Sequence, residues 1–97
     1  MTTYFVLGKY TNQGIRNIKE HPGRVEAARK LAESVGVNLK GFFLTVGSCD
    51  MIIRLEAEAD TSVAKFLLAV ASQGNVTTDT LRAFSESEFQ EIVADLP

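Results

Sequence analysis

The chain has 97 residues, and its 10 basic and 12 acidic side chains give a formal net charge of −2. This balance excludes the strongly basic surface that binding to nucleic acid or to an anionic membrane requires, so neither partner is expected. One cysteine excludes an internal disulfide, no apolar run approaches the roughly 18 residues of a membrane span, and the N-terminus lacks a signal-peptide pattern. We therefore expect a cytoplasmic protein with a single domain over residues 1–97.

The first predicted strand runs from Tyr4 to Tyr10, where aromatic and β-branched residues alternate with other residues. Alternation places Phe5 and Leu7 on one face of the strand and Tyr4, Val6 and Tyr10 on the other. Residues 11–14 follow as a turn or a helix cap, and a short helical segment is expected between them and the next proline.

A longer helix is predicted to begin at Pro22 and to end at Gly36. Proline is favoured in the first turn of a helix, and glycine is favoured just past its end. The apolar stripe of this helix is narrow and consists of Val25, Ala28, Ala32 and Val35. The charged residues of its other face are interpreted as a solvated surface: Arg24, Glu26, Arg29, Lys30 and Glu33.

The next two strands are predicted to form a hairpin, with the second strand beginning at Val37 and the third ending near Ala57. The turn lacks the Asn-Gly signature of a tight two-residue loop, so we expect a four-residue loop from Gly47 to Asp50. The predicted register places six apolar side chains on one face by pairing Val46 with Met51, Leu44 with Ile53, and Phe42 with Leu55. The other face has mixed polarity and carries Phe43, Thr45, Asp50, Ile52, Arg54 and Glu56.

The last part of the sequence predicts a helix, a strand and a second helix. Asp60 is expected to cap the first of these helices, which ends at Gly74 and has a central apolar stripe of Val63, Phe66, Leu67 and Val70. Residues 76–84 form a more polar strand, which is typical of a sheet edge. Ser85 to Glu88 is a capping box, and it opens a final helix whose inward side chains are predicted to be Phe89, Ile92, Val93 and Leu96.

This order of elements predicts an α+β fold, namely a ferredoxin-like βαββαβ sandwich with an extra C-terminal helix. Right-handed crossovers favour a four-stranded antiparallel sheet of order 4-1-3-2. The end of the first strand, the Gly47–Asp50 turn and the start of the fourth strand then lie at one edge. We expect five residues to converge there: Tyr10, Thr11, Asn12, Asp50 and Asn75.

Five segments spaced along the chain form a recognisable pattern: Tyr4–Ile15, Pro22-Gly23-Arg24, Gly47-Ser48-Cys49-Asp50, Gly74-Asn75-Val76 and Leu81-Arg82-Ala83-Phe84. With these segments the chain resembles the GYD domain family over nearly its full length. The resemblance implies a ferredoxin-like fold of the dimeric α/β-barrel type, and it supplies a fold rather than an activity, because the family is functionally uncharacterised. One departure is that Cys49 stands where the family's Gly-x-Tyr-Asp motif has its tyrosine.

One face of the predicted sheet is left uncovered by the helices, although it is too apolar to face water. Its predicted members are Tyr4, Val6, Tyr10, Phe43, Thr45, Ile52, Arg54, Val76, Thr80, Arg82 and Phe84. An exposed patch of this size is typical of an interface, so the chain is predicted to form a homo-oligomer, a dimer or larger, through this face. The alternative is that the terminal helix folds over the face as a lid.

Polar residues at this face and at the turn edge are candidates for binding a small molecule: Tyr10, Thr11, Asn12, Thr45, Asp50 and Arg54. Phe43 and Phe84 would then supply aromatic walls. The structural alternative is that Arg54 pairs with Glu56 and that Asp50 only fixes the turn.

Neither a metal site nor a cofactor is expected. The chain has one histidine and one cysteine, at a spacing unrelated to that of metal ligands. No histidine neighbours Cys49 in the sequence to activate its thiol, so an ordinary turn residue is favoured over a nucleophile. His21 directly precedes Pro22 and is expected to cap the helix or to face solvent, while haem ligation by His21 stays open.

These observations lead to two functional hypotheses. The first is an oligomeric module that binds a small molecule or serves as a scaffold through the open sheet face and the Gly47–Asp50 turn. The second is a cofactor-independent enzyme, a small oxygenase or isomerase, that uses Tyr10, Asp50 and Arg54 around a hydrophobic substrate. The second hypothesis rests on an analogy of fold alone. A closed cavity with a buried polar cluster would favour the enzyme, because a scaffold needs neither.

Overall fold

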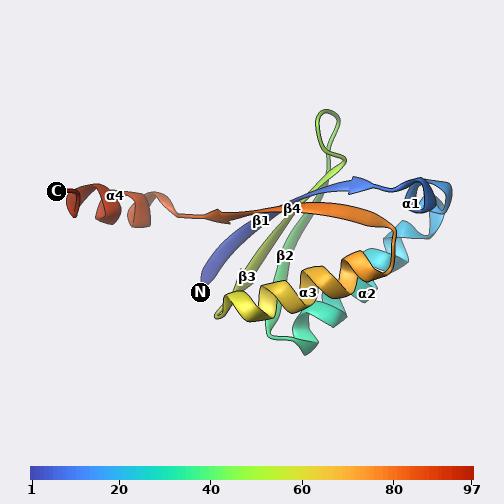
Figure 1. Ribbon diagram of the computed structural model, residues 1–97, viewed down its shortest axis with the longest axis horizontal. Helices are drawn as coiled ribbons and strands as arrows, with labels where there is room; N and C mark the ends of the chain where they lie inside the picture. Colours follow the sequence, from blue (N-terminus) through green and yellow to red (C-terminus); the bar gives the residue numbers. More distant parts are fainter.

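Four strands form one antiparallel sheet in the computed structural model, which describes residues 1–97 (Figure 1). The elements in chain order are β1 (Thr2–Tyr10), α1 (Asn12–Arg16), the 3-10 helix η1 (Ile18–Glu20), α2 (His21–Ser34), β2 (Val37–Leu44), β3 (Met51–Ala57), α3 (Asp60–Ser72), β4 (Val76–Ala83) and α4 (Glu86–Ala94). The strands lie in the order β2-β3-β1-β4, which is the predicted order 4-1-3-2 read from the opposite edge. The predicted ferredoxin-like α+β fold is therefore confirmed.

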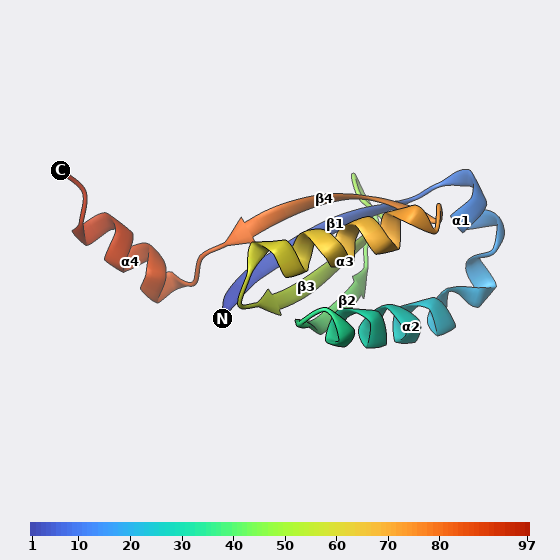
Figure 2. The same cartoon turned by 60° about the horizontal axis from the view of Figure 1, so that its bottom comes forward.

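Helices α2 and α3 cover the same face of the sheet and leave the other face open (Figure 2). The chain contains no helix with both the length and the apolar character that crossing a membrane requires.

Local signals in the sequence place most of the helix ends correctly. The Thr11 hydroxyl accepts a hydrogen bond from the backbone N–H of Gly14 and caps α1. Gly36 and Gly74 follow α2 and α3 with φ angles of +83° and +79°, which glycine adopts without steric cost. The capping box of α4 is formed, since Ser85 and Glu88 exchange side-chain-to-backbone hydrogen bonds.

The predicted cap of α3 is wrong. The N-cap position of α3 is Ala59, and no side chain caps the helix there. Asp60 is the first helical residue, and its carboxylate accepts a hydrogen bond from the hydroxyl of Tyr4 instead. This contact, followed by burial, raises the pKa of Tyr4, so its phenol stays protonated.

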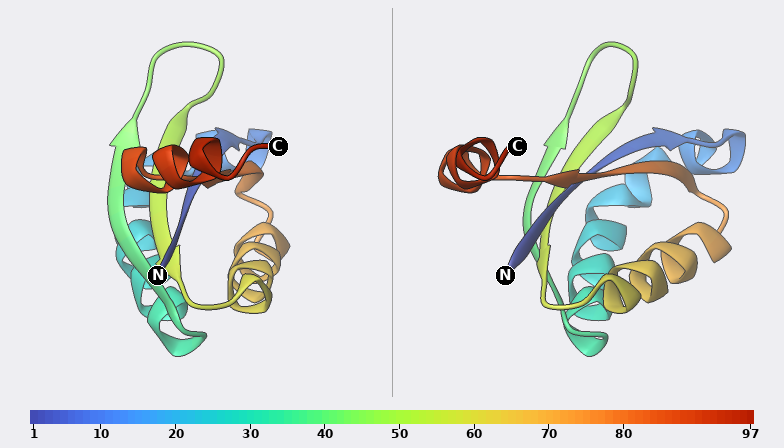
Figure 3. Two further views of the ribbon diagram at one scale, coloured as in Figure 1. Left: turned by 90° about the vertical axis from the view of Figure 1, so that its left-hand side faces the viewer. Right: turned by 60° about the vertical axis from the view of Figure 1, so that its left-hand side comes forward.

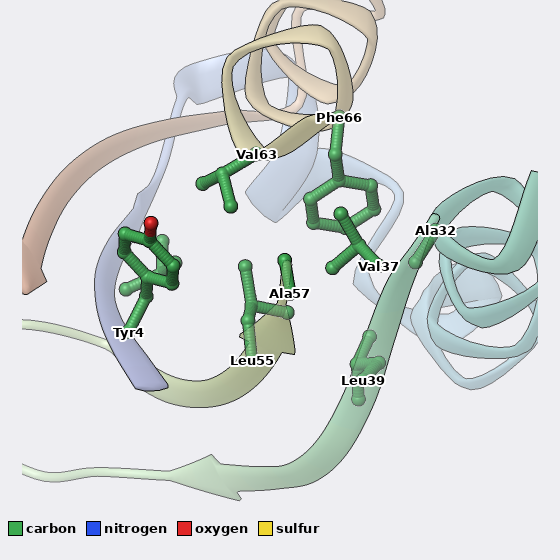
Figure 4. Close-up of a cluster of buried hydrophobic side chains, with 9 residues drawn as sticks. Tyr4, Ala32, Val37, Leu39, Leu55, Ala57, Val63 and Phe66 are labelled. Atoms are coloured by element: carbon green, nitrogen blue, oxygen red, sulfur yellow. The ribbon is translucent and has the colours of Figure 1, made fainter. Parts of the chain in front are cut away.

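The core lies between the sheet and helices α2 and α3, and Figure 4 shows side chains from each of these elements meeting there. Leu55 and Val37 of the sheet and Ala32 of α2 have no exposed surface, and Phe66 of α3 is 2% exposed. Full burial of a Val, Leu or Phe side chain contributes about 1.5–3 kcal/mol. The apolar stripes predicted for α2 and α3 are therefore confirmed as the faces that meet the sheet.

The predicted faces of β1 are reversed in the structure. Tyr4 and Val6 are 5% and 1% exposed and lie on the helix-covered face, whereas Phe5 and Leu7 lie on the open face. The reason is the register with the neighbouring strand, because Tyr4 stands opposite Leu55 of the apolar row. On β4, three residues paired with this row of β1 move to the covered face with it: Val76, Thr80 and Arg82.

The hairpin keeps the predicted faces, but its register is shifted by two residues. Leu44 pairs with Met51 and Phe42 pairs with Ile53, so the loop contains six residues, 45–50, instead of four. Val46 is fully exposed at the tip of the hairpin, which projects beyond the rest of the sheet (Figure 1). A β-bulge between Leu39 and Gly41 changes the register by one residue, so that Leu39 pairs with Leu55 and Val37 with Ala57.

The C-terminal helix α4 does not pack on its own sheet. It extends away from the body of the protein, along the direction in which β4 ends (Figures 1 and 3). Its four predicted inward residues are 47–64% exposed: Phe89, Ile92, Val93 and Leu96. The radius of gyration is 14.7 Å, whereas a compact chain of this length has a value of about 12.5 Å. Both the inward packing of α4 and its alternative as a lid are therefore wrong for the single chain.

Two glycines provide a matched test of the packing of α1 against Asn75. A Cβ atom added to Gly14 would lie 2.0 Å from the backbone carbonyl oxygen of Asn75, whereas one added to Gly23 in α2 meets nothing within 4 Å. We expect Gly14→Ala to lower the free energy of unfolding by about 1–3 kcal/mol or more, because backbone atoms must move apart. Gly23→Ala should raise it by about 0.5–1 kcal/mol, because alanine favours the helix. Urea denaturation of both variants measures the difference, and equal effects would contradict the close contact of α1 with residue 75.

Candidate functional site

The end of β1 is tied to the hairpin loop by Asp50. The Asp50 carboxylate accepts a hydrogen bond of 2.9 Å from the backbone N–H of Tyr10, and the backbone N–H of Asp50 donates one of 2.8 Å to the carbonyl of Gly8. A hydrogen bond to a charged group contributes more than a neutral one, about 1.5–3 kcal/mol. Asp50 therefore has the structural role that the sequence left open, and it holds the hairpin against the central strand.

The start of β4 meets the same end of β1. The Thr11 hydroxyl donates a hydrogen bond of 2.6 Å to the carbonyl of Gly74, and the backbone N–H of Thr11 donates one of 3.1 Å to the carbonyl of Asn75. The Gln13 amide reaches the side-chain oxygen of Asn75 at 3.0 Å. The predicted meeting of Tyr10, Thr11, Asp50 and Asn75 at one edge is thus present in the structure.

The other predicted site residues do not join this cluster. Arg54 lies on the open face four residues from Asp50 along the chain, and its guanidinium pairs with Glu56 at 3.2 Å. The Thr45 hydroxyl donates to the carbonyl of Cys49 at 2.7 Å and stays within the hairpin loop. The Asn12 side chain is exposed. Ligand binding by the six predicted residues remains a prediction, but they do not line one common pocket.

The hairpin loop borders a shallow cavity of about 350 Å³ at the end of the sheet. Its lining comes from the loop, β1 and β4 and consists of Leu7, Lys9, Ser48, Cys49, Thr77, Thr78 and Asp79. The Cys49 sulfur is 3.5 Å from the Thr45 hydroxyl, and no cluster of three or more His, Cys, Asp or Glu side chains in the chain is able to hold a metal ion.

A smaller and more apolar cavity of about 60 Å³ lies between the covered face of the sheet, the first half of α2 and the end of α3. Eight of its twelve lining residues are hydrophobic: Val25, Ala28, Leu39, Phe42, Met51, Ile53, Val70 and Val76. The four polar ones are His21, Arg24, Gln73 and Asn75. A cavity of this size has no room for a haem, so haem ligation by His21 is not supported.

His21 is held in this cavity by two aromatic rings. Its imidazole meets the Tyr10 ring edge-on with 5.1 Å between the centroids, and the Phe42 ring lies 5.4 Å away on another side. Both ring nitrogens are buried and have no hydrogen-bond partner. Burial and then the positive charge of Arg24 lower the pKa of His21, so the ring is neutral near pH 7. The prediction that His21 caps the helix or faces solvent is wrong.

Arg24 lies one helical turn after His21 and also points inward. One guanidinium nitrogen, Nη2, donates hydrogen bonds to the carbonyls of Gly14 and Asn17, while Nε and Nη1 are buried without a partner. Arg24 forms no ion pair. A partly buried cation with two unused donors is costly unless an anion or water completes it.

Sequence reasoning missed His21 and Arg24 because polar residues near a helix start are usually solvated. The available signal was their spacing. Residues 21, 24, 25 and 28 recur at intervals of three and four, so His21 and Arg24 lie on the same face of α2 as the apolar Val25 and Ala28.

The fold and these features define a ferredoxin-like α+β protein with one uncovered sheet face and a small inner cavity. The GYD domain family profile matches residues 4–93, and the chain belongs to that family. The resemblance seen in the sequence is therefore confirmed.

A relative from Thermus thermophilus, named glutamine synthetase and cystathionine beta-lyase binding protein, is 33% identical over 84 residues. The match covers 86% of this chain and 88% of that protein. Two solved structures share the fold. TTHA0845 from Thermus thermophilus has a TM-score of 0.57 at 20% identity, and the match covers 88% of this chain and 95% of that one. The hypothetical protein PHS023 from Pyrococcus horikoshii has a TM-score of 0.57 at 22% identity, and the match covers 89% and 93%.

His21 is the single histidine of the chain, so its ring can be followed directly by NMR. We expect it to titrate below the ordinary value of 6.5, because burial and Arg24 lower its pKa. Between these two values the unfolded chain binds a proton that the folded chain does not, so His21 reduces the free energy of unfolding as pH falls from 7 through 6.5 toward the lowered pKa.

The control for this prediction is His21→Gln, which cannot titrate. The unfolding free energy of the wild type relative to that of His21→Gln should decrease over the same pH range, measured by urea denaturation. A ring that titrates at or above 6.5 would contradict the buried, unpartnered position of His21.

Proposed function

We propose that the protein is an oligomeric binding module, or scaffold, that associates through its open sheet face with a second copy of the chain. The observation that supports this most strongly is that the chain exposes two apolar surfaces, the open face and α4, and that neither covers the other.

The apolar part of the open face consists of Phe5, Leu7, Phe43, Ile52 and Leu81. The pairing of the strands makes these side chains contiguous, because Phe43 stands opposite Ile52, Ile52 opposite Leu7, and Phe5 opposite Leu81. Phe43 and Leu81 are 59% and 49% exposed, because no layer of the fold covers them. Contiguous exposed patches of this kind mark interaction sites in soluble proteins.

Helix α4 supplies the second surface. Its apolar side chains are exposed on a helix that stands clear of the body (Figure 3). The direction of α4 is held locally, since Arg82 of β4 pairs with Glu88 at 3.6 Å and lies 4.0 Å over the ring of Phe84. A short amphipathic helix has little stability without a partner for its apolar face, and the open face of a second copy has the required character.

The charges of α4 and of the rest of the chain are compatible with docking of α4 onto a second copy. Residues 85–97 contain four acidic side chains and no basic one, whereas the whole chain has a net charge of −2, so residues 1–84 have a net charge of +2. The helix of one copy and the body of another therefore attract each other at long range.

The name of the Thermus thermophilus relative supports the binding half of the proposal, because that protein is described as binding two enzymes. The enzyme hypothesis receives less support from the geometry. Tyr10 is on the covered face, where burial and then the Asp50 charge raise its pKa, while Arg54 is on the open face beside Glu56. These residues do not surround one substrate.

The oligomer can be tested by size-exclusion chromatography with light scattering at micromolar concentration. We expect a mass of at least twice the 10.6 kDa of the single chain. Phe43→Glu on the open face and Ile92→Glu on α4 should each shift the mass toward the monomer, because a carboxylate would be buried without a partner. The matched control is Leu68→Glu on α3, where an apolar side chain of the size of Ile92 is 72% exposed outside the proposed interface.

The control should keep the oligomer, and circular dichroism should show that all three variants are folded. A wild-type mass of 10.6 kDa over the whole concentration range, or equal behaviour of the control and the two interface variants, argues against the proposed interface.

The enzyme-binding role is tested separately with purified glutamine synthetase. We expect the fluorescently labelled wild-type protein to sediment with the enzyme in analytical ultracentrifugation. The variant Phe43→Glu should sediment with the enzyme to a smaller extent, because the oligomer is the proposed binding form. Sedimentation of the labelled protein at its own rate in the presence of the enzyme would restrict the proposal to self-association.

A further inference from the structure

We propose that the inner cavity is a binding site for a short monocarboxylate of about the size of acetate or propionate. Arg24 and His21 bind its carboxylate, and the apolar wall receives its methyl or ethyl group. This site lies on the opposite side of the sheet from the open face and does not depend on the oligomer.

The positive charge of the site favours the binding of an anion. Arg24 is the one charged residue that lines the cavity, it has no carboxylate partner, and its Nε and Nη1 atoms are buried with unused hydrogens. Asp50 is near enough to act on the Tyr10 ring, but its carboxylate accepts a hydrogen bond from the backbone N–H of Tyr10 and forms no ion pair with Arg24. No carboxylate of the chain therefore lies within ion-pairing distance of the Arg24 guanidinium.

The unpaired N–H donors of the site favour a ligand with oxygen acceptors. Arg24 offers N–H donors from two buried nitrogens, and a neutral His21 offers one N–H from its ring. The two residues are one helical turn apart on the same face of α2, so their side chains start from neighbouring positions. Gln73 and Asn75, near the end of α3 and the start of β4, are the other polar residues of the lining.

The size and polarity of the cavity narrow the class of anion. One water-sized group needs at least about 10–15 Å³, so a cavity of about 60 Å³ holds no more than about four to six such groups. Acetate has four non-hydrogen atoms and propionate has five. Inorganic phosphate would place oxygens against the hydrophobic residues that form two-thirds of the lining, whereas a short alkyl carboxylate places carbon there.

Gly8 leaves room for Met51, one of the residues that line the cavity. It is a buried residue of the central strand on the covered face, between Val6 and Tyr10. A Cβ at Gly8 would come within 2.8 Å of Met51, which lines the cavity. The absence of a side chain at residue 8 thus lets the Met51 side chain pack closely against β1.

The experiment is an NMR titration of the wild-type protein with sodium acetate, propionate and hexanoate, compared with sodium chloride and with neutral acetamide. We expect saturable shifts of the backbone amides of residues 21–28 and 73–76 and of the His21 ring nitrogens with acetate and propionate. Acetamide should bind at least about tenfold more weakly, because it lacks the charge that Arg24 recognises. Hexanoate distinguishes a free short acid from the carboxyl end of a longer chain, since equally tight binding of hexanoate would show an open tail site and overturn the size limit.

Two variants and one control locate the site. Arg24→Gln should weaken propionate binding by about tenfold or more, and Arg29→Gln should leave it unchanged, because Arg29 pairs with Glu26 and does not line the cavity. Arg24 also holds the carbonyls of Gly14 and Asn17, so a second variant, Ala28→Leu, fills the apolar wall and leaves the charge in place. It should reduce the affinity for propionate more than that for formate.

Linear, unsaturated shifts with every salt, or saturable shifts that map outside residues 21–28 and 73–76, would overturn the proposal and leave water as the occupant of the cavity. Equal binding of acetate and acetamide would also overturn it, because the charge of Arg24 would then have no role.

Discussion

The register of β1 between its two neighbours is the constraint on which the other features depend. Tyr4 stands opposite Leu55 on one side and Arg82 on the other, and this pairing turns Tyr4, Val6, Gly8 and Tyr10 toward the helices. The covered face thereby gains its core. Tyr10 is brought against His21. The same pairing necessarily turns Phe5 and Leu7 outward, so the sheet has an apolar surface on both sides while its helices cover one.

The sequence predicts the elements and their order well, because these follow from local signals. Caps, glycines with positive φ and apolar periodicity do not depend on distant contacts. The hairpin register is different. A shift of two residues keeps every side chain on its own face, so the polarity pattern that fixed the faces is equally satisfied by both registers. The choice is made by contacts with another strand, chiefly those of Asp50 with Gly8 and Tyr10, which no pattern within the hairpin contains.

The errors in the candidate site have the same physical origin. Both faces of β1 are apolar, so alternation alone has no preference for either, and residues assigned to the open face proved to form the core. The amphipathic pattern of α4 shows that it needs a partner but not whether that partner belongs to the same chain. His21 and Arg24 were assigned to solvent because of their residue types, although their spacing places them on the same face of α2 as Val25 and Ala28, which line the cavity with them.

The replacement of the motif tyrosine by Cys49 affects the loop less than the sequence alone indicated. The features that shape the loop are the φ angle of +152° at Gly47, the backbone carbonyl of residue 49, which accepts from Thr45, and the two bonds of Asp50 to β1. None of them uses the side chain of residue 49. That side chain instead borders the cavity of about 350 Å³ beside the open face. A larger residue would occupy part of this space, so cysteine at this position changes the surface next to the open face while the attachment of the loop to the central strand is retained.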